Sequence, residues 1–447
     1  MQDLTKGPIL KGILLFALPL LLGNFFQMAY TTVDAFIVGK NVGALGVGAI
    51  GTSSIVAGLI INSGQGITVG MSLLTSRYFG AKDFDAVKRS FSIGFYSTII
   101  LSSALTALAL LLINQILQVM QVPATLFEMT KTYMSLLFIG MIFFNLYNYF
   151  AASMRALGNS RISLYALIVS NIINAALSAF FVMALHLGIF GAGLGMVISQ
   201  GLSVIFLAIY IKVRMKAFQF RWVSFSWQEL KEHLRIGLPM GLQSSIINIG
   251  SLVQQIAINH VGALAIVAFS IGQKYDGFAG SITSSLGIAM ATFAAQNLGA
   301  KTTERLTKGI KQVLLLAVSY SLVFSAFLLI FNRTFTGLFM NMASDPRIYA
   351  TTFQYYLANG SLYWLLGVLF ITRYTLQGMG DVAAPTLAGT MELVFRSIFA
   401  ILGVFLGNVF IVLASEGVAW IGSTAVLIPA TLRLFRRLRQ QKNPSIS

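Results

Sequence analysis

The chain has no cysteine and only three histidines among its 447 residues. Without cysteine it can form neither disulfides nor thiolate metal sites. His186 and His260 are expected near the outer ends of membrane spans and His233 in a linker, with no paired acids and no metal-ligand spacing such as HExxH. We therefore expect neither an enzyme nor a resident metal or other cofactor.

Charge is also scarce, since 10% of the residues are charged while 57% are hydrophobic and the mean hydropathy is +0.82. No soluble domain could bury that much apolar surface, so the composition indicates an integral membrane protein. Apolar stretches long enough to span a bilayer follow one another from Gly12 to Leu432, and their length predicts about twelve spans. The stretches are continuous and do not alternate at period two, which excludes a β-barrel and predicts an all-α fold. The first stretch has no small-residue cleavage pattern and is interpreted as a retained span.

The few charged residues are mostly basic, and they give the chain a formal net charge of +17. Nucleic-acid binding could account for this positive charge, but the cations gather in alternate breaks between spans, which is typical of membrane topology and lipid headgroup contact. The positive-inside rule then predicts a multi-pass protein of the plasma (inner) membrane with both termini cytoplasmic. The cations in these breaks, apart from the closing run 433-RLFRRLRQQK-442, are Lys6, Lys11, Arg77, Lys82, Lys88, Arg89, Arg155, Arg161, Lys212, Arg214, Lys216, Arg221, Lys231, Arg235, Lys301, Arg305, Lys308 and Lys311.

The two halves of the chain resemble each other. LPLLLGN, VGAL, FGAKDFDAVKRS and RALGN in the first half recur in the same order as LPMGLQS, VGAL, LGAKTTERLTKG and QGMGD in the second. Because an even number of spans separates equivalent points, we expect two homologous six-helix bundles related by a pseudo-twofold axis along the membrane normal. The predicted parts are a bundle over 1–212, a cytoplasmic linker over 213–235, a bundle over 236–433 and a basic cytoplasmic tail over 434–447. Such a pair of bundles is typical of a transporter whose halves rock, with the linker absorbing the movement.

Polar residues in several spans recur at helical spacing and so share one face. In a bilayer such a face has to point at protein or water, because lipid offers no hydrogen-bond partner. Simple adhesion between helices remains the alternative to a substrate path for any one of these residues. The stripes comprise Asn24, Gln27, Thr31 and Asp34 in span one, Asn145, Tyr147 and Asn148 in span four, Ser170, Asn171, Asn174 and Ser178 in span five, and Ser244, Asn248, Ser251 and Gln255 in span seven.

Asp34 is the one acid in the first span. An ionised aspartate at a helix centre costs about 2.5 to 3.5 kcal/mol on the insertion scale, so it is expected to be paired, protonated or functional. No cation lies near it on the same span, because Lys40 stands at the outer end. Since low-dielectric surroundings penalise a charge, we expect Asp34 to exchange a proton, and competition of proton and cationic substrate for one bundle would give antiport.

The second half has no acid at the point that matches Asp34, and its intramembrane charges lie elsewhere. Glu392 and Arg396 stand at i and i+4 and are predicted to neutralise each other. Lys274 and Asp276 do not share a helix face, so the partner of Asp276 is expected on another helix. These four residues are interpreted as mainly structural, with the alternative that Lys274 or Asp276 lines the substrate path.

The segment FALPLLLGNFFQMAYTTVDAFIVGKNVGALGVGAIG resembles the start of the multidrug and toxic compound extrusion (MATE) family, in the branch with the DNA-damage-inducible protein F and MepA-type exporters. FGAK, AAQNLGAK and LQGMGDVAAP resemble further turns of that family, and the likeness covers essentially the whole chain. The resemblance implies a twelve-helix antiporter that exports amphipathic, often cationic organic compounds against inward H⁺ or Na⁺, with Asp34 central to coupling.

One departure from the family bears on the coupling ion. Relatives often carry an Asn followed four residues later by an Asp in the fifth span, and here Asn174 is followed by Ser178. Sodium prefers anionic oxygens, so the loss of a carboxylate favours H⁺ over Na⁺ at a site of Asp34, Asn171, Asn174 and Ser178.

The alternative function is a lipid flippase, specifically of lipid-linked oligosaccharides, which calls for a cationic cavity to hold pyrophosphate. The candidate cations are few (Lys274, Arg396 and Arg373), and an acidic, amide-lined interior suits organic cations better. The expected partners are small organic molecules and the lipid bilayer, without nucleic acid, and the chain is expected to act as a monomer. The predicted substrate cavity comprises Asn24, Gln27, Tyr30, Thr31, Asn145, Tyr147, Tyr149, Asn248, Ser251, Gln255, Lys274 and Asp276.

Overall fold

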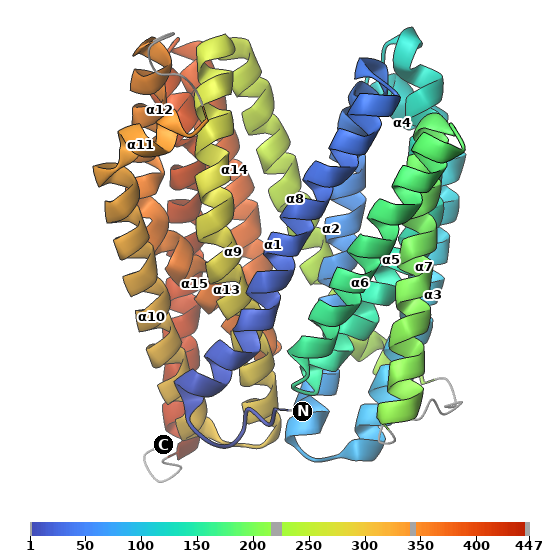
Figure 1. The fold of residues 1–447 in the computed structure, drawn as a ribbon. Coiled ribbons are helices and arrows are strands. Elements are labelled where there is room, and N and C mark those ends of the chain that lie inside the picture. Colours follow the sequence, from blue (N-terminus) through green and yellow to red (C-terminus); the bar gives the residue numbers. More distant parts are fainter. Residues whose placement is uncertain (1, 216–225, 340–345, 443–447) are drawn as a thin grey trace. The chain divides into compact units, whose positions relative to one another are not determined.

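The computed structural model describes residues 2–215, 226–339 and 346–442, except for the side chains of residues 29–35, 44, 54, 55, 57, 441 and 442. Every regular element in these ranges is a helix, which confirms the predicted all-α fold (Figure 1). Helices suit so apolar a chain because each helix forms its backbone hydrogen bonds within itself, and lipid offers no partner for these groups.

The first half of the chain forms seven α-helices and one π-helical turn. Their bounds are α1 (Ile9–Asn41), α2 (Ala44–Gly80), α3 (Phe84–Leu111), α4 (Ile113–Val119), α5 (Ala124–Ala156), α6 (Ser160–Ala179), η1 (Phe180–Ala184) and α7 (Gly188–Arg214).

The second half repeats this order, with the counterpart of α5 divided by a 3₁₀ turn. The bounds are α8 (Trp227–Val261), α9 (Ala263–Gly299), α10 (Thr303–Ile330), α11 (Asn332–Gly337), α12 (Pro346–Ala358), η3 (Gly360–Leu362), α13 (Tyr363–Gly378), α14 (Ala383–Phe405) and α15 (Val409–Lys442).

The described helices confirm the predicted number of spans. Eleven of them are long and apolar enough to cross a membrane, and a bent pair within α2, Leu45–Ser53 with Gly58–Gly80, would be the twelfth. Each expected span therefore corresponds to a helix or to a pair of helices.

The internal repeat is visible in the backbone as well as in the sequence. The starts of α2, α3 and α4 precede those of α9, α10 and α11 by the same number of residues. Gly43 and Gly262, which precede α2 and α9, both have positive φ angles, of 83° and 120°. Lys82 and Lys301, in the turns that follow the same helices, also share a positive φ, of 60° and 56°. The duplication thus extends to individual turn residues.

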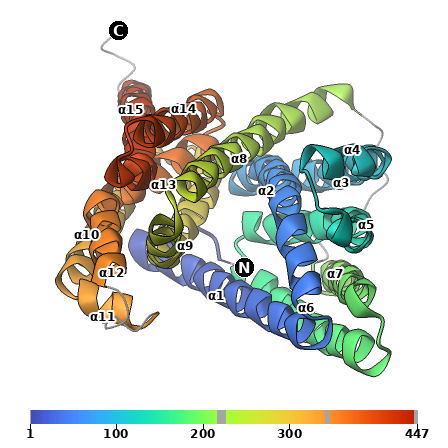
Figure 2. The same cartoon turned by 90° about the horizontal axis from the view of Figure 1, so that it is seen from above.

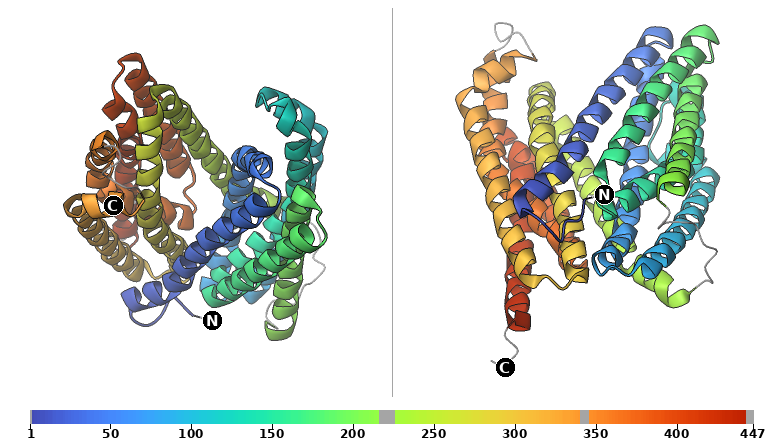
Figure 3. Two further views of the ribbon diagram at one scale, coloured as in Figure 1. Left: turned by 45° about the horizontal axis from the view of Figure 1, so that its top comes forward. Right: turned by 60° about the horizontal axis from the view of Figure 1, so that its bottom comes forward.

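The chain forms two compact units, as far as the structure describes them. Unit 1 comprises Met1–Asp3 and Leu18–Gly241, and unit 2 comprises Leu4–Ala17 and Leu242–Ser447. In unit 1, α5 packs against α2, α3, α6 and α7, and in unit 2, α13 packs against α9, α10, α14 and α15 (Figure 2). The last two helices of each unit, α6 with α7 and α14 with α15, lie side by side (Figure 3).

The first turns of α1 belong to unit 2 because α10 holds the chain that precedes them. The guanidinium group of Arg305 donates to the carbonyl oxygens of Leu4, Lys6 and Gly7 at 3.2, 2.7 and 2.7 Å. The Gln296 side chain accepts from the Leu4 amide at 3.1 Å. These bonds replace the intrahelical partners that a chain segment before a helix lacks.

The first turns of α8 belong to unit 1, where they cross α2 at glycines. A Cβ atom on Gly66 would lie 2.6 Å from the carbonyl oxygen of Met240, and one on Gly70 would lie 2.7 Å from the Cα of Gly237. Small residues at this spacing let two membrane helices approach closely. The crossing therefore depends on the absence of side chains at these positions.

The predicted linker over 213–235 and tail over 434–447 are in part helical. Residues 216–225 and 443–447 lie outside the described residues, while Trp227 to Arg235 form the first turns of α8 and α15 continues to Lys442. His233, which was predicted to lie in this linker, is buried in α8. Its Nε2 lies 2.9 Å from Ser90 Oγ and its Nδ1 2.7 Å from the Glu229 carbonyl oxygen.

Candidate functional site

The polar stripe of the first span lies on one continuous helix, α1, as its spacing predicts. Asn24 on this helix is partly buried and Gln27 is exposed. The side chains of Tyr30, Thr31 and Asp34 lie outside the described residues, so their roles stay predictions. What the structure establishes is that the backbone of this segment is helical throughout.

The fifth-span stripe forms a short hydrogen-bonded chain inside unit 1. Asn174 Nδ2 donates to Ser199 Oγ of α7 at 3.1 Å, and Ser178 Oγ donates to Asn174 Oδ1 at 3.3 Å. Both residues are buried. Asn171 Nδ2 and Ser170 Oγ are buried without a hydrogen-bond partner in the described part of the chain. The stripe thus joins α6 to α7 and also presents unsatisfied polar atoms, which are costly in a low-dielectric interior.

The fourth-span residues lie in the interior of unit 1. Asn145 Nδ2 donates to Ser102 Oγ of α3 at 2.9 Å, whereas Asn145 Oδ1 is buried without a described partner. Tyr147 and Tyr149 donate to the carbonyl oxygens of Ser163 and Phe91 at 3.3 and 2.8 Å. Both rings belong to the hydrophobic core of the unit. The structure therefore places these two tyrosines in packing positions, away from any exposed face.

The seventh-span stripe on α8 divides between two environments. Ser251 accepts a hydrogen bond from Arg396 Nη1 at 2.7 Å, while Gln255 bonds the exposed Asn259 of its own helix at 2.9 Å. Asn248 Nδ2 donates to the Ser244 carbonyl oxygen at 2.8 Å. The fully buried Gln254, outside the predicted stripe, donates to Ser415 Oγ of α15 at 3.0 Å. Gln254 thus joins α8 to α15.

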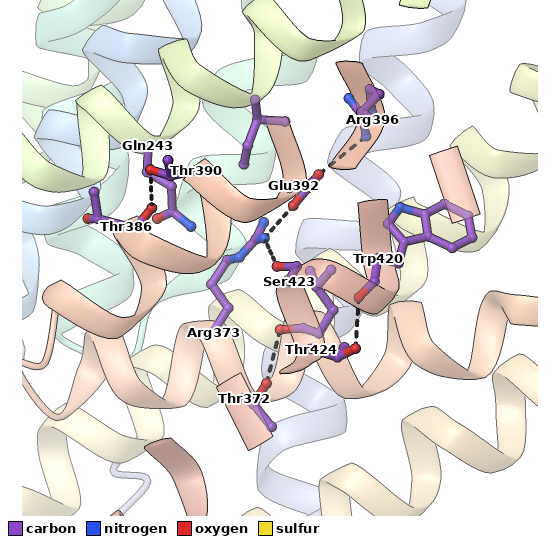
Figure 4. Close-up of polar contacts among 12 residues, drawn as sticks. Gln243, Thr372, Arg373, Thr386, Thr390, Glu392, Arg396, Trp420, Ser423 and Thr424 are labelled. Atoms are coloured by element: carbon purple, nitrogen blue, oxygen red, sulfur yellow. Dashed lines mark hydrogen bonds and ion pairs between the residues drawn. The ribbon is translucent and has the colours of Figure 1, made fainter. Parts of the chain in front are cut away.

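Four charged side chains form an alternating chain inside unit 2. Glu392 accepts from Arg373 Nη2 at 2.6 Å and pairs with Arg396 Nη2 at 3.3 Å, and Arg396 Nη2 also pairs with Glu416 at 2.7 Å. Figure 4 shows Arg373 between Glu392 and Ser423, to which it donates at 2.9 Å. The helices α13, α14 and α15 each contribute to the chain. With two arginines and two glutamates, it is neutral when all four groups are ionised.

The pairing of Glu392 with Arg396, which their spacing predicts, is present in this alternating chain of charges. The sequence analysis missed Glu416 and the pairing of Arg373 with Glu392. A third carboxylate inside the apolar run 409-VFIVLASEGVAWIG-422 was the available signal. Its partner could not be identified from the sequence, because Arg396 lies on a different helix.

Asp276 on α9 is held by hydroxyl groups. Tyr355 of α12 and Tyr363 of α13 each donate to one of its carboxylate oxygens, the second at 2.6 Å. The sequence-based expectation that its partner lies on another helix is thus met, by two tyrosines rather than by a cation. Lys274, two residues away, is exposed. Lys274 and Asp276 therefore do not act as a pair.

Comparison with known proteins gives a consistent result. The protein-family model described as MatE matches residues 19–180 and 239–402. The chain is 27% identical over 449 residues to the probable multidrug resistance protein YoeA of Bacillus subtilis, covering 97% of this chain and 94% of that protein. It is 24% identical over 412 residues to the multidrug export protein MepA of Staphylococcus aureus, covering 89% of this chain and 90% of that one.

Solved structures show the same fold. One, described as an outward-facing conformation of a multidrug resistance MATE family transporter, superposes with a TM-score of 0.87 at 21% identity, covering 98% of this chain and 97% of that one. The Vibrio cholerae transporter VcmN in its bent form superposes with a TM-score of 0.86 at 18% identity, covering 97% of each chain. At these identities the likeness concerns the fold.

Proposed function

Because this chain belongs to the MATE family, we propose that it is a secondary active multidrug exporter for amphipathic, cationic organic compounds. The observation that carries the proposal is that unit 1 has amides and hydroxyls, and unit 2 hydroxyls and carboxylates, inside apolar spans, where such groups are costly and are usually kept for function. Relatives that match nearly the whole chain are named for multidrug resistance or export, which supports this class of substrate.

The coupling ion that we propose is H⁺, exchanged at Asp34. The described hydrogen-bonding groups of the fifth-span stripe, Asn174 and Ser178 of α6 with Ser199 of α7, are all neutral. Neutral amides and hydroxyls can form hydrogen bonds with a carboxyl group whether it is protonated or ionised. They carry no anionic oxygen, which is the ligand that a Na⁺ ion prefers. We further propose that both termini are cytoplasmic and that the monomer is the transporting unit.

A lipid flippase is the weaker alternative. It would need cations that are free to bind a pyrophosphate group. Arg373 and Arg396 are both paired with glutamates inside unit 2, and their guanidinium groups are almost fully buried. The membrane-embedded arginines are thus already neutralised, which favours a cationic cargo.

The test is export from intact cells that carry the wild-type chain, the Asp34→Asn variant or the control variant Asp85→Asn. Asp85 suits as a control because it is an exposed acid whose described ion pair, with Lys88, lies in the first turns of α3. We expect wild type and control to raise resistance to cationic dyes and to export them, while Asp34→Asn inserts at the same level and does neither.

Two results would count against the proposal. Undiminished export by Asp34→Asn would refute coupling through this residue. Failure of the wild type to confer resistance to any member of a panel of cationic compounds, at normal membrane levels, would refute the function.

A further inference from the structure

We propose that Asp276 is a second proton-exchange site, located in unit 2 and separate from Asp34. The inference rests on a charge count and on the hydrogen-bonding chemistry around this carboxyl group. It extends the proposed proton-coupled export, but the site can be tested without measuring transport.

The charge count singles out Asp276 among the acids within the spans of unit 2. Arg373, Glu392, Arg396 and Glu416 form the alternating chain that neutralises itself. Asp276 is outside that chain, and within the described residues no lysine or arginine lies at ion-pair distance from it. When ionised, it therefore leaves one uncompensated negative charge in the bundle, a state that the membrane interior disfavours.

The partners of Asp276 can satisfy either protonation state. An ionised carboxylate only accepts hydrogen bonds, and it receives one from Tyr355 and one from Tyr363. A protonated carboxyl group has an O–H to donate, and a tyrosine hydroxyl that rotates becomes its acceptor. One proton can thus enter from water onto a carboxylate oxygen and later return to water, with one hydroxyl reversing its role at each step.

The two glutamates of the alternating chain, Glu392 and Glu416, lack this freedom. Glu392 accepts from Arg373 and Arg396, and Glu416 accepts from Arg396 at 2.7 Å. Arginine remains protonated in proteins and can only donate, so it favours the ionised form of its partner. Glu392 and Glu416 are therefore held in their ionised forms, whereas Asp276 can exchange a proton.

The groups that act on Asp276 come from several packed helices. Tyr355 of α12 and Tyr363 of α13 touch it, and Arg396 of α14 and Glu416 of α15 act on it through space. These last two charges have opposite signs and belong to the neutral chain. From α10, Tyr320 acts on Tyr363.

A proton fits this site better than a metal ion. Within the described residues no group of three or more His, Cys, Asp and Glu side chains converges as a metal site. One carboxylate with two hydroxyl groups provides fewer oxygens than the six or more that a hard cation takes.

The site can be tested by infrared difference spectroscopy of the purified full-length protein in lipid, recorded as the pH is stepped. We expect a protonated-carboxyl band that titrates in the wild type, is missing in Asp276→Asn and is retained in the control Asp85→Asn. Retention of every titrating band in Asp276→Asn would overturn the proposal. So would a band that responds to Na⁺ in place of pH.

Tyrosine variants keep the test valid if Asp276→Asn fails to fold. Tyr355→Phe and Tyr363→Phe each remove one donor to the ionised form and leave the carboxyl group in place. Each lost hydrogen bond destabilises the ionised carboxylate relative to its protonated form. We expect proton binding to tighten about tenfold in each variant, which moves the midpoint of the band up by about one pH unit. A midpoint unchanged in both variants would contradict the assignment.

The outcome for this site and the outcome for export can be read separately. If Asp276 titrates while the wild type exports nothing, the site stands and the proposed function fails. If the wild type exports dyes under a proton gradient while no Asp276 band exists, the function stands and the second site fails.

Discussion

The substitution Arg396→Met tests whether the charged chain of unit 2 is a neutral, interdependent unit. Arg396 is 2% exposed, and it bonds Glu416, Glu392 and Ser251. Methionine keeps most of its length but leaves Glu416 without its arginine. Breaking a buried ion pair on one side typically costs about 3–5 kcal/mol, because it leaves a buried charge uncompensated.

Protonation of the stranded glutamate limits this loss. Taking a carboxyl group with a reference pKa of about 4.3 to its neutral form at pH 7 costs about 3.7 kcal/mol, at 1.36 kcal/mol per pH unit. At pH 5 the same step costs about 1 kcal/mol. We therefore expect Arg396→Met to lose about 3–4 kcal/mol of unfolding free energy at pH 7 and about 1–2 kcal/mol at pH 5.

The double variant Arg396→Met/Glu416→Gln separates charge from packing. It removes both members of the outer pair and leaves Arg373 with Glu392, so the chain is neutral again. Replacing a buried ion pair by neutral residues is often close to neutral for stability, and we expect the double variant to recover about 2 kcal/mol or more of the loss at pH 7.

The assay is unfolding in mixed micelles by titration with a denaturing detergent, followed by tryptophan fluorescence. Trp420 is buried one turn after Glu416 and reports on this region. A loss below about 1 kcal/mol for Arg396→Met at pH 7 would refute the reasoning, since it is less than one buried pair is worth. A double variant as unstable as the single one would do the same.

Three further predictions concern contacts within each unit; the first two use the same unfolding assay and the third uses hydrogen exchange. Gly70→Ala should destabilise the protein because the new Cβ would lie 2.7 Å from the Gly237 Cα. The control Gly58→Ala should be neutral or stabilising, because a Cβ at Gly58 would have no heavy atom within 4 Å. Equal effects of the two substitutions would contradict the close crossing of α2 and α8. His233→Ala should cost about 1–3 kcal/mol through its lost bond to Ser90, while His260→Ala, at an exposed position, should change little. Arg305→Ala should expose the chain around Leu4 to rapid hydrogen exchange, and unchanged protection there would count against the triple carbonyl contact.

The helices and their duplication could be predicted from the sequence because both depend on local patterns. Apolar runs of spanning length can form only helices, and the recurring turns place equivalent helix starts at a constant interval. The pairing of Glu392 with Arg396 was accessible for the same reason, since four residues make one helical turn.

The contacts that could not be predicted join residues far apart in the chain. Arg396 bonds Ser251 and Glu416, and Gln254 bonds Ser415, but no spacing rule relates these positions. His233 stands in a polar, basic stretch that resembles a linker by composition, yet its ring is enclosed by α3 and its own helix. Composition reports which residues are polar and leaves open which of them packing will bury.

Tyr149 shows that one sequence pattern fits both a binding surface and core packing. An aromatic residue with a polar tip on a polar helix face fits a drug-binding surface, so the sequence places it in the substrate cavity. Its ring is fully buried beside Phe91 and Phe150, and its hydroxyl group bonds a backbone carbonyl oxygen. The same chemistry serves packing here, because a buried tyrosine needs only one acceptor for its hydroxyl group.

Proton-coupled export is tested most directly by simultaneous recording of dye and pH in proteoliposomes that contain only this protein. With an acidic interior and no Na⁺, the vesicles should accumulate a cationic dye against its own gradient while protons leave, and an imposed Na⁺ gradient at equal pH should drive nothing. Dye accumulation that follows Na⁺ alone, or none under either gradient with correctly inserted protein, would contradict this mechanism.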